Sequence, residues 1–197
     1  TLNMASRGLF GEVMHVEGAY IHDLRSLNLD TADRTGYQGM WRLDYNTRHT
    51  GNPYPTHGLG PVCQILGIHR GDRMERLVSL STAQRGLTLA AREKFGPDSQ
   101  WAQRDYRLGD MNTTRTARGK TILIQHDVTS PRPYNRLHTI SGTKGFAQKY
   151  PVETIALDPN AHAPLPERQR DSLLSIYEHP ITREIGEKAR QVGGHGG

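Results

Sequence analysis

The stretch NPYPTHGLGP at residues 52–61 is a loop-to-helix junction that organises the rest of the chain. A helix is predicted to follow it, because apolar residues then recur at helical spacing, namely Leu59, Val62, Cys63 and Leu66. Thr56 is a natural N-cap residue, which would place His57 in the first helical turn. The helix dipole disfavours an imidazolium there, so His57 should stay neutral and able to accept a proton. Tyr54 lies just before the cap, between two prolines that stiffen its approach. This pattern indicates a positioned polar site, although a capped helix with a surface histidine fits it equally well.

Composition limits the classes of function that the chain can have. With 197 residues it is long enough for one domain with a sizeable core. The net charge is +5, but acidic residues are interleaved with the basic ones, and no run of like charge resembles a nucleic-acid arm. No apolar run approaches the roughly 20 residues that cross a membrane. The one cysteine, Cys63, excludes a disulfide within the chain and is predicted to fill the core. The histidine spacings contain no recognised metal motif.

Strand-like segments dominate the middle of the chain and helical ones its ends. Residues 11–22 alternate, with one face formed by Met14, Val16, Gly18, Tyr20 and His22. Further strands are predicted at residues 76–81, 113–129, 136–141 and 153–157. Helices are predicted at residues 1–9 and 87–95, around 173–177 and at 185–192, with a polar irregular segment at 28–51. This order favours an α+β fold with an open, mainly antiparallel sheet and flanking helices. No GxGxxG or P-loop sequence occurs, so the chain has no dinucleotide-binding loop of its own.

Four segments together resemble a known family. GAYIHDLR at 18–25, Trp41-Arg42, the stretch at 52–61 and HDVTSPRPY at 126–134 resemble glycoside hydrolase family 109 of the Gfo/Idh/MocA superfamily. The resemblance runs from residue 2 to residue 197 in the family's order. It implies that residues 1–197 form one substrate-side, sheet-bearing domain, truncated at both ends, with the Rossmann domain absent. We expect these residues alone to be inactive.

The resemblance implies an NAD-dependent α-N-acetylgalactosaminidase acting on terminal α-linked N-acetylgalactosamine. In this family NAD oxidises the sugar C3 hydroxyl, a base removes the acidified C2 proton, the aglycone is eliminated, water adds and the hydride returns. The NAD would be held mainly by the missing Rossmann domain. By resemblance, His57 lies near the C3 hydroxyl, Tyr20 is a candidate C2 base, and substrate is bound by Arg42, Tyr54 and Tyr134. The structural alternatives are a cap histidine for His57, a core tyrosine for Tyr20, a surface arginine for Arg42 and a stacking ring for Tyr54. Strand alternation puts His126 and Asp127 on opposite faces, so His126 is interpreted as structural.

Two other functions stay open at this point. A redox-only relative would oxidise or reduce a sugar or polyol with NAD(P) and would lack the elimination step. A non-catalytic module would bind or oligomerise through the open sheet, as superfamily members often do. The family resemblance also suggests a bacterial periplasmic or secreted location. It implies that the partners are a carbohydrate, the Rossmann domain and a second copy of the chain.

Overall fold

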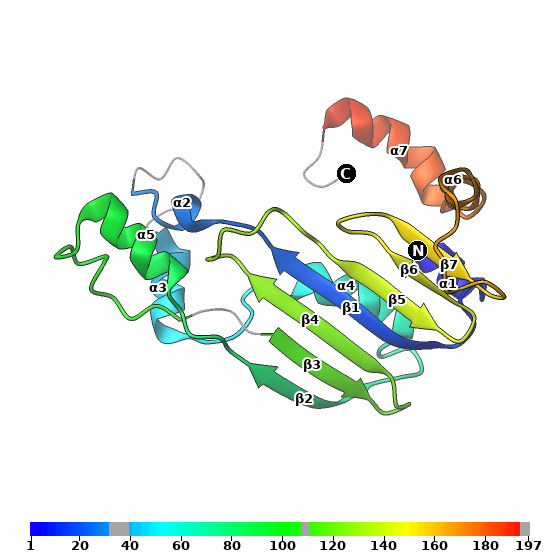
Figure 1. Cartoon of the computed structure of the whole chain (residues 1–197), viewed down its shortest axis with the longest axis horizontal. Helices are drawn as coiled ribbons and strands as arrows, with labels where there is room; N and C mark the ends of the chain where they lie inside the picture. Colours follow the sequence, from blue (N-terminus) through cyan, green and yellow to red (C-terminus); the bar gives the residue numbers. More distant parts are fainter. Residues whose placement is uncertain (32–39, 108–110, 194–197) are drawn as a thin grey trace.

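A seven-stranded open sheet forms the body of the computed structural model, which describes residues 1–31, 40–107 and 111–193 (Figure 1). The strand order is β2-β3-β4-β1-β5-β6-β7, and only the β1–β4 pair is parallel. The strands are β1 (Val13–Ile21), β2 (Met74–Leu80), β3 (Met111–Thr116), β4 (Thr121–Asp127), β5 (His138–Gly142), β6 (Gly145–Gln148) and β7 (Thr154–Leu157). The predicted α+β class with a mainly antiparallel open sheet is therefore confirmed.

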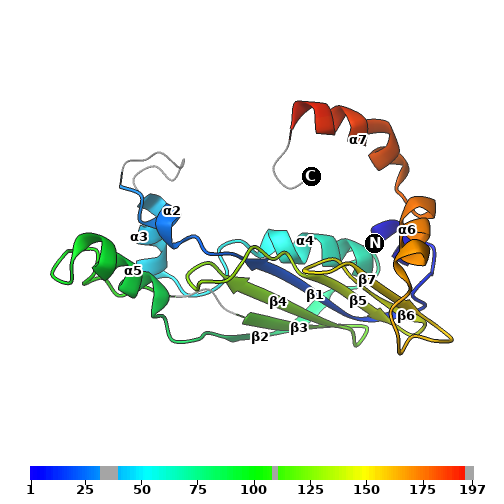
Figure 2. The ribbon, with the colours of Figure 1, turned by 45° about the horizontal axis from the view of Figure 1, so that its top comes forward.

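Helices cover one face of this sheet. In Figure 2, α4 (Pro55–Leu66) lies along β1, and α1 (Leu2–Ser6), α6 (Glu167–Ile176) and α7 (Pro180–Val192) lie on the same side. In the described ranges no helix covers the opposite face of β1 and β4. The core forms between α4 and the sheet, from Val62 and Leu66 of the helix and from Val16, Ile122, Ile124 and Ile140 of the strands. No helix in the described residues is long and apolar enough to cross a membrane.

The central strands follow the predicted alternation except at two places. Met14 was predicted to share a face with Val16, but it is 55% exposed whereas Val16 is buried, because a bulge between Val13 and His15 shifts the register and puts Val13 inside. The single strand predicted at 113–129 is two antiparallel strands, β3 and β4. They are joined by a turn in which Gly119 has a φ of +80° and the Thr116 N–H bonds the Lys120 carbonyl. The alternation continues on both sides of this turn, which hides it in the sequence.

Helix α4 begins two residues earlier than the sequence suggested. Tyr54 is the N-cap residue and Pro55 occupies the first position, so the prediction of Thr56 as the N-cap is wrong. His57 nevertheless lies in the first turn, as predicted. Cys63 packs against the core, which confirms its predicted role, and burial raises the pKa of its thiol.

A close backbone contact holds α4 against β1. Gly58 of α4 faces Gly18 of β1, and a Cβ added at Gly58 would lie 2.8 Å from the Gly18 carbonyl carbon and from the Ala19 nitrogen. Only two glycines allow helix and strand to approach so closely. This contact sets the distance between the first turn of α4 and the C-terminal half of β1.

A second lobe lies beyond the C-terminal ends of β1 and β4 (Figure 1). It consists of α2 (Arg25–Asn28), α3 (Trp41–Arg48) and α5 (Gly86–Phe95), packed around Leu29, Leu43, Leu87, Ala91 and Tyr106. The irregular segment predicted at 28–51 is therefore wrong where α3 forms, because Leu43 gains its stabilisation from α5 rather than from a local pattern. Residues 32–39 of that segment lie outside the described residues.

Candidate functional site

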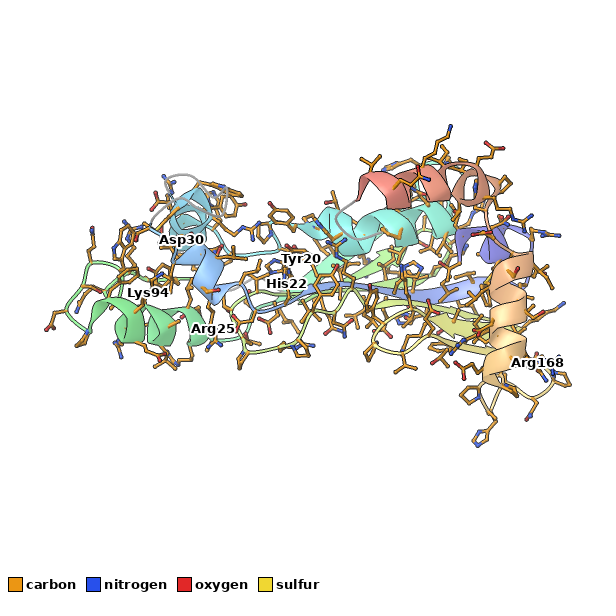
Figure 3. All side chains as sticks on the ribbon, turned by 90° about the horizontal axis from the view of Figure 1, so that it is seen from above. Tyr20, His22, Arg25, Asp30, Lys94 and Arg168 are labelled. Carbon is orange, nitrogen blue, oxygen red and sulfur yellow. The ribbon has the colours of Figure 1, made fainter. Side chains whose placement is uncertain are left out.

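Tyr20 is the centre of a cluster of rings at the C-terminal end of β1, between α4 and the second lobe (Figure 3). Its ring centroid lies 4.4 Å from that of His57, 5.3 Å from Tyr54 and 5.8 Å from His126. Tyr54 and His126 are nearly parallel to it, at interplanar angles of 14° and 18°. Two of the predicted site tyrosines and the predicted site histidine therefore meet in one place. Tyr20 is 7% exposed and packs in a small core cluster with Leu24 and Val128, so the alternative of a core tyrosine stays open beside the catalytic role.

His57 joins this cluster from the N-terminal turn of α4. The Gly18–Gly58 contact brings the turn against β1, so that His57 and Tyr20 are neighbours although 37 positions separate them. The helix N-terminus disfavours a positive charge on His57, which leaves the imidazole able to accept a proton. A neutral imidazole and a phenol in contact form a pair that can move protons at two neighbouring positions of a ligand.

Arg42 approaches the cluster from α3 and is buried, with 1% of its surface exposed. Its guanidinium carbon lies 4.4 Å from the centroid of the Tyr54 ring, a cation–π distance. The alternative of a solvated surface arginine is therefore wrong. A role for Arg42 in binding substrate stays a prediction.

Tyr134 lies at the rim of the cluster, with 42% of its surface exposed. Its ring centroid is 5.4 Å from that of His22 and 6.0 Å from that of Tyr150. An isolated bridge between Ile21 and Asn135 fixes this loop next to β1, with Tyr134 and Arg136 on either side of the bridged residue. The loop thus presents Tyr134 towards the other predicted site residues.

Arg136 belongs to the cluster and was not singled out from the sequence. Its guanidinium carbon lies 5.9 Å from the Tyr20 ring centroid and 5.4 Å from that of Tyr134. Within the described ranges no carboxylate is paired with it. The alternating pattern of an extended segment, which puts residues two apart on the same side, could have linked Arg136 to Tyr134.

His126 stacks on Tyr20 because the two residues are partners in the parallel β1–β4 register. It is 5% exposed. Burial is the largest cause that lowers its pKa to about 4, and the positive charge of Arg42 is the next largest. Neither ring nitrogen has a hydrogen-bond partner in the part of the chain that the structure describes. Asp127 faces away, as predicted, and its Oδ1 accepts bonds from the Thr129 and Ser130 N–H groups at 3.2 and 3.1 Å. His126 and Asp127 therefore form no dyad.

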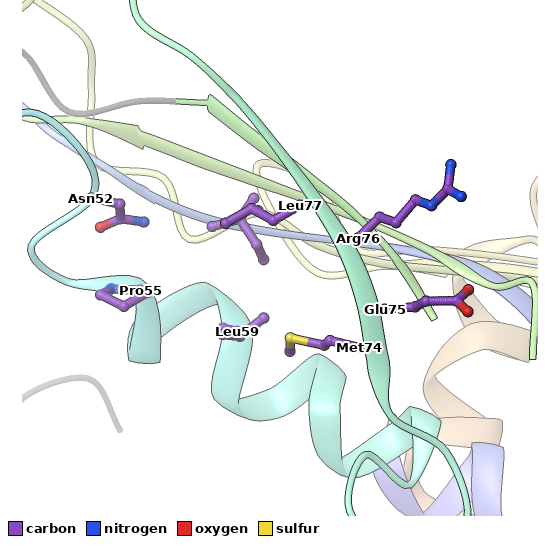
Figure 4. Close-up of a pocket in the computed structure, with 8 residues that line it drawn as sticks. Asn52, Pro55, Leu59, Met74, Glu75, Arg76 and Leu77 are labelled. Carbon is purple, nitrogen blue, oxygen red and sulfur yellow. The ribbon is translucent and has the colours of Figure 1, made fainter. Parts of the chain in front are cut away.

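Two cavities flank the N-terminal half of α4. One of about 250 Å³ lies beside His57, and its other walls include Tyr134, Arg136, Lys149 and Tyr150. The other, of about 420 Å³, is mainly apolar and lies between α4 and β2 (Figure 4). In that view Leu59 and Met74 approach each other, whereas Arg76 and Glu75 point away from α4. Tyr20 lines neither cavity, whereas His57 lines the smaller one, so we place the candidate site at the smaller one.

The described ranges contain no group of three or more His, Cys, Asp or Glu side chains that could hold a metal ion. The polar groups that meet at the site are instead phenols, imidazoles and guanidinium groups. These groups can bind hydroxyl and carbonyl oxygens and transfer protons.

Comparisons with known proteins identify the family to which the chain belongs. The family model described as glycosyl hydrolase 109, C-terminal domain, matches residues 1–197. The chain is 58% identical over 193 residues to an alpha-N-acetylgalactosaminidase of Bacteroides fragilis, covering 97% of this chain and 45% of that protein. It is 53% identical to glycosyl hydrolase family 109 protein 2 of Phocaeicola vulgatus, covering 97% and 47% of the two chains. The chain thus spans about half the length of the curated relatives that it matches.

Solved structures share the fold at low sequence identity. An inositol dehydrogenase homolog of Azotobacter vinelandii, complexed with NADH and myo-inositol, has a TM-score of 0.53 at 13% identity, over 81% of this chain and 36% of that one. A levoglucosan dehydrogenase complexed with NADH and levoglucosan has a TM-score of 0.53 at 13% identity, over 82% and 40% of the two chains. These matches establish the fold of the sheet domain as that of the oxidoreductases.

Proposed function

Because the chain belongs to the C-terminal domain family of glycosyl hydrolase 109, we propose that it forms the substrate side of an NAD-dependent α-N-acetylgalactosaminidase. The substrate would be a terminal α-linked N-acetylgalactosamine. The relative of Bacteroides fragilis carries this activity in its name, and the solved relatives of the same fold carry NADH. The cofactor would be held mainly by a nucleotide-binding domain outside these 197 residues, since the chain has no GxGxxG loop.

The donor set around Tyr20 fits a bound nicotinamide cofactor, because it provides proton acceptors and no competing metal ligands in the described residues. When bound, NAD would take a hydride from the sugar C3 position and return it at the end of the cycle. The residues of this chain then have the tasks of binding the sugar, orienting it and moving protons.

His57 and Tyr20 divide the proton transfers in this proposal. His57, kept neutral by its position at the helix N-terminus, accepts the proton of the C3 hydroxyl. Tyr20 removes the proton at C2 once oxidation of C3 has acidified it. A phenol is a weak base at neutral pH, and the positive charge of Arg136 near its ring favours the phenolate form. Contact between the His57 and Tyr20 rings matches the adjacency of C2 and C3 in the sugar.

Arg42, Tyr54 and Tyr134 would hold the sugar. Tyr134 offers an exposed ring at the rim, and the two tyrosine hydroxyls can bond sugar oxygens. Arg42 packs against the Tyr54 ring and offers N–H donors to hydroxyl or acetamide oxygens. Tyr54 is fixed between Arg42 and Tyr20, so its hydroxyl is pre-oriented before substrate arrives.

The observation that carries the proposal is the absence of a catalytic carboxylate pair at the site. Ordinary glycosidases need two carboxylates about 5 to 9.5 Å apart. Among the described residues no Asp or Glu lines the cavity beside His57. The nearby acids are engaged elsewhere: Asp127 caps two backbone N–H groups, and Asp23 bonds Arg25, which lowers the pKa of Asp23. A redox and elimination route needs no such pair.

A release assay with the full-length protein tests the proposal. We expect p-nitrophenol release from an α-N-acetylgalactosaminide to require NAD⁺, and His57→Ala to lower kcat by about 10²- to 10⁴-fold. His162→Ala, at an exposed loop position, is the matched control and should behave as wild type. Substrate deuterated at C2 should exchange its label with solvent.

Net NADH formation from free sugars, with no release of p-nitrophenol, would instead assign the protein to the sugar or polyol oxidoreductases. The NADH-bound structures with this fold give that second function its support. If the protein showed neither p-nitrophenol release nor NADH formation, the remaining function would be that of a non-catalytic binding or oligomerisation module.

We also propose that the sheet face without a helix mediates self-association. The exposed side chains on that face of β2 include Val78 and Leu80, at an edge strand that a second copy would cover. A periplasmic or secreted location completes the proposal, and fractionation of cells that produce the full-length protein tests it.

A further inference from the structure

The cavity beside His57 is lined by cations as well as by the sugar-binding candidate Tyr134. Its walls include His57 and Tyr134 together with Arg136, Lys149 and Tyr150. The Tyr134 and Tyr150 rings meet edge to face at 6.0 Å, and the Lys149 ammonium lies 5.6 Å from the Tyr150 ring centroid. The volume of about 250 Å³ is close to the lower end of the sizes of small-molecule sites, about 300–1,000 Å³.

The charges of this cavity are not balanced by the chain that surrounds them. Its described lining residues include the cationic side chains of Arg136 and Lys149 and also Thr1, whose N-terminal amine is a third positive group, and they include no carboxylate. The Nε atom of Arg136 is buried and has no hydrogen-bond partner in residues 1–31, 40–107 and 111–193. A buried donor of a charged group is costly to leave unbonded, because burial removes it from water without replacing the lost bond.

The backbone holds Lys149 in place at this wall. The Lys149 N–H donates to the His138 carbonyl at 2.9 Å, which extends the β5–β6 pairing by one residue. Burial first, then the positive charges of the N-terminal amine and of Lys149, lowers the pKa of His138 in the same wall to about 4. His138 therefore stays neutral at physiological pH and adds a polar but uncharged group.

We propose that Arg136 and Lys149 form a subsite that binds an oxyanion group next to the sugar site. Two aromatic rings with two cations and no acid are the side chains that recognise a carboxylate, sulfate or phosphate on a ring-shaped ligand. The favoured source is an acidic sugar linked to the N-acetylgalactosamine that is released, because His57 lines the same cavity. This inference rests on the proposed function. The other source of such a group is a phosphate of the dinucleotide.

The test compares two disaccharides that differ only in charge. In both, N-acetylgalactosamine is α-linked to the second sugar, which is galactose in one and galacturonic acid in the other. Release of N-acetylgalactosamine by the full-length protein gives kcat/KM for each. We expect Lys149→Gln to lower the ratio of acidic to neutral kcat/KM by about three- to tenfold, and added salt to lower that ratio in the wild type. The matched control is Lys144→Gln, at an exposed lysine outside the cavity lining, which should leave the ratio unchanged.

The dinucleotide source has its own readout. If Lys149→Gln weakens NAD⁺ binding by threefold or more and leaves the disaccharide ratio unchanged, the oxyanion is a cofactor phosphate and the acidic-sugar assignment is overturned. If neither quantity changes, the subsite itself is overturned.

A failure of the proposed function can be distinguished from a failure of the subsite. Wild type that releases no sugar from the neutral disaccharide refutes the glycosidase, whatever the subsite does. Calorimetric titration with sodium sulfate then still tests the subsite, since Lys149→Gln should weaken sulfate binding and Lys144→Gln should not. Equal sulfate affinity in all three proteins would overturn it.

Discussion

The contact between Gly58 and Gly18 leaves no room for a side chain at either position, and Gly58→Ala tests it directly. The added methyl group would lie 2.8 Å from backbone atoms of Gly18 and Ala19. Ordinary van der Waals contacts begin at about 3.4 Å, so α4 would have to move away from β1 by about 0.6 Å or more. Neither neighbour can rotate away, because both are main-chain atoms.

The displacement has two measurable consequences. Overpacking of this kind costs about 1–3 kcal/mol of stability. It also moves His57, the adjacent residue, relative to Tyr20 on β1, and a misplacement near 1 Å lowers catalysis by about 10²-fold. We therefore expect Gly58→Ala in the full-length protein to lower both the unfolding midpoint and kcat/KM for p-nitrophenyl α-N-acetylgalactosaminide.

Gly60→Ala is the matched control within the same helix. A Cβ at Gly60 meets no atom within 4 Å, and alanine favours a helix over glycine by about 0.5–1 kcal/mol. It should therefore be neutral or stabilising and should keep the activity. If Gly58→Ala matched Gly60→Ala in both the unfolding midpoint and kcat/KM, the close approach of α4 to β1 would be refuted.

Three further predictions concern the rings and charges around Tyr20. Tyr20→Phe keeps the stack with Tyr54 and His126 but removes the hydroxyl, so we expect kcat to fall by about 10²- to 10⁴-fold while circular dichroism shows an intact fold. Arg136→Gln removes the cation near the Tyr20 ring, so the pH–rate profile should move to higher pH, and an unshifted profile would show that the cation has no electrostatic role. The pKa of His126 falls from 6.5 in the unfolded chain to about 4 in the fold, so only the unfolded state gains a proton as the pH falls through that window. His126 should therefore contribute at most about 3 kcal/mol to the loss of stability between pH 6.5 and pH 4. Urea unfolding should show a loss smaller by that amount in His126→Phe, where the contribution of His138 remains.

Local sequence patterns predicted the strands in which buried and exposed residues alternate and the helix in which apolar residues recur at helical spacing. The alternation in β1 and β4 and the helical spacing of Val62 and Leu66 identified the central layers. The same reasoning missed the turn at residues 117–120, because alternation resumes after it in phase with the preceding strand. It also missed α3, whose Leu43 is buried against α5 rather than along a periodic apolar stripe of its own.

The sequence by itself determined that His57 lies in the first turn of a helix and that Tyr20 lies near the end of a strand. These follow from interactions between residues a few positions apart, which set helix starts and strand alternation. Only the tertiary structure decided that His126 lies behind Tyr20, that Arg42 supports Tyr54 and that Arg136 adds its charge. The pairing of Tyr20 with His126 depends on the register of two strands about a hundred positions apart. That register is fixed by the burial of whole faces against α4, which no local pattern contains.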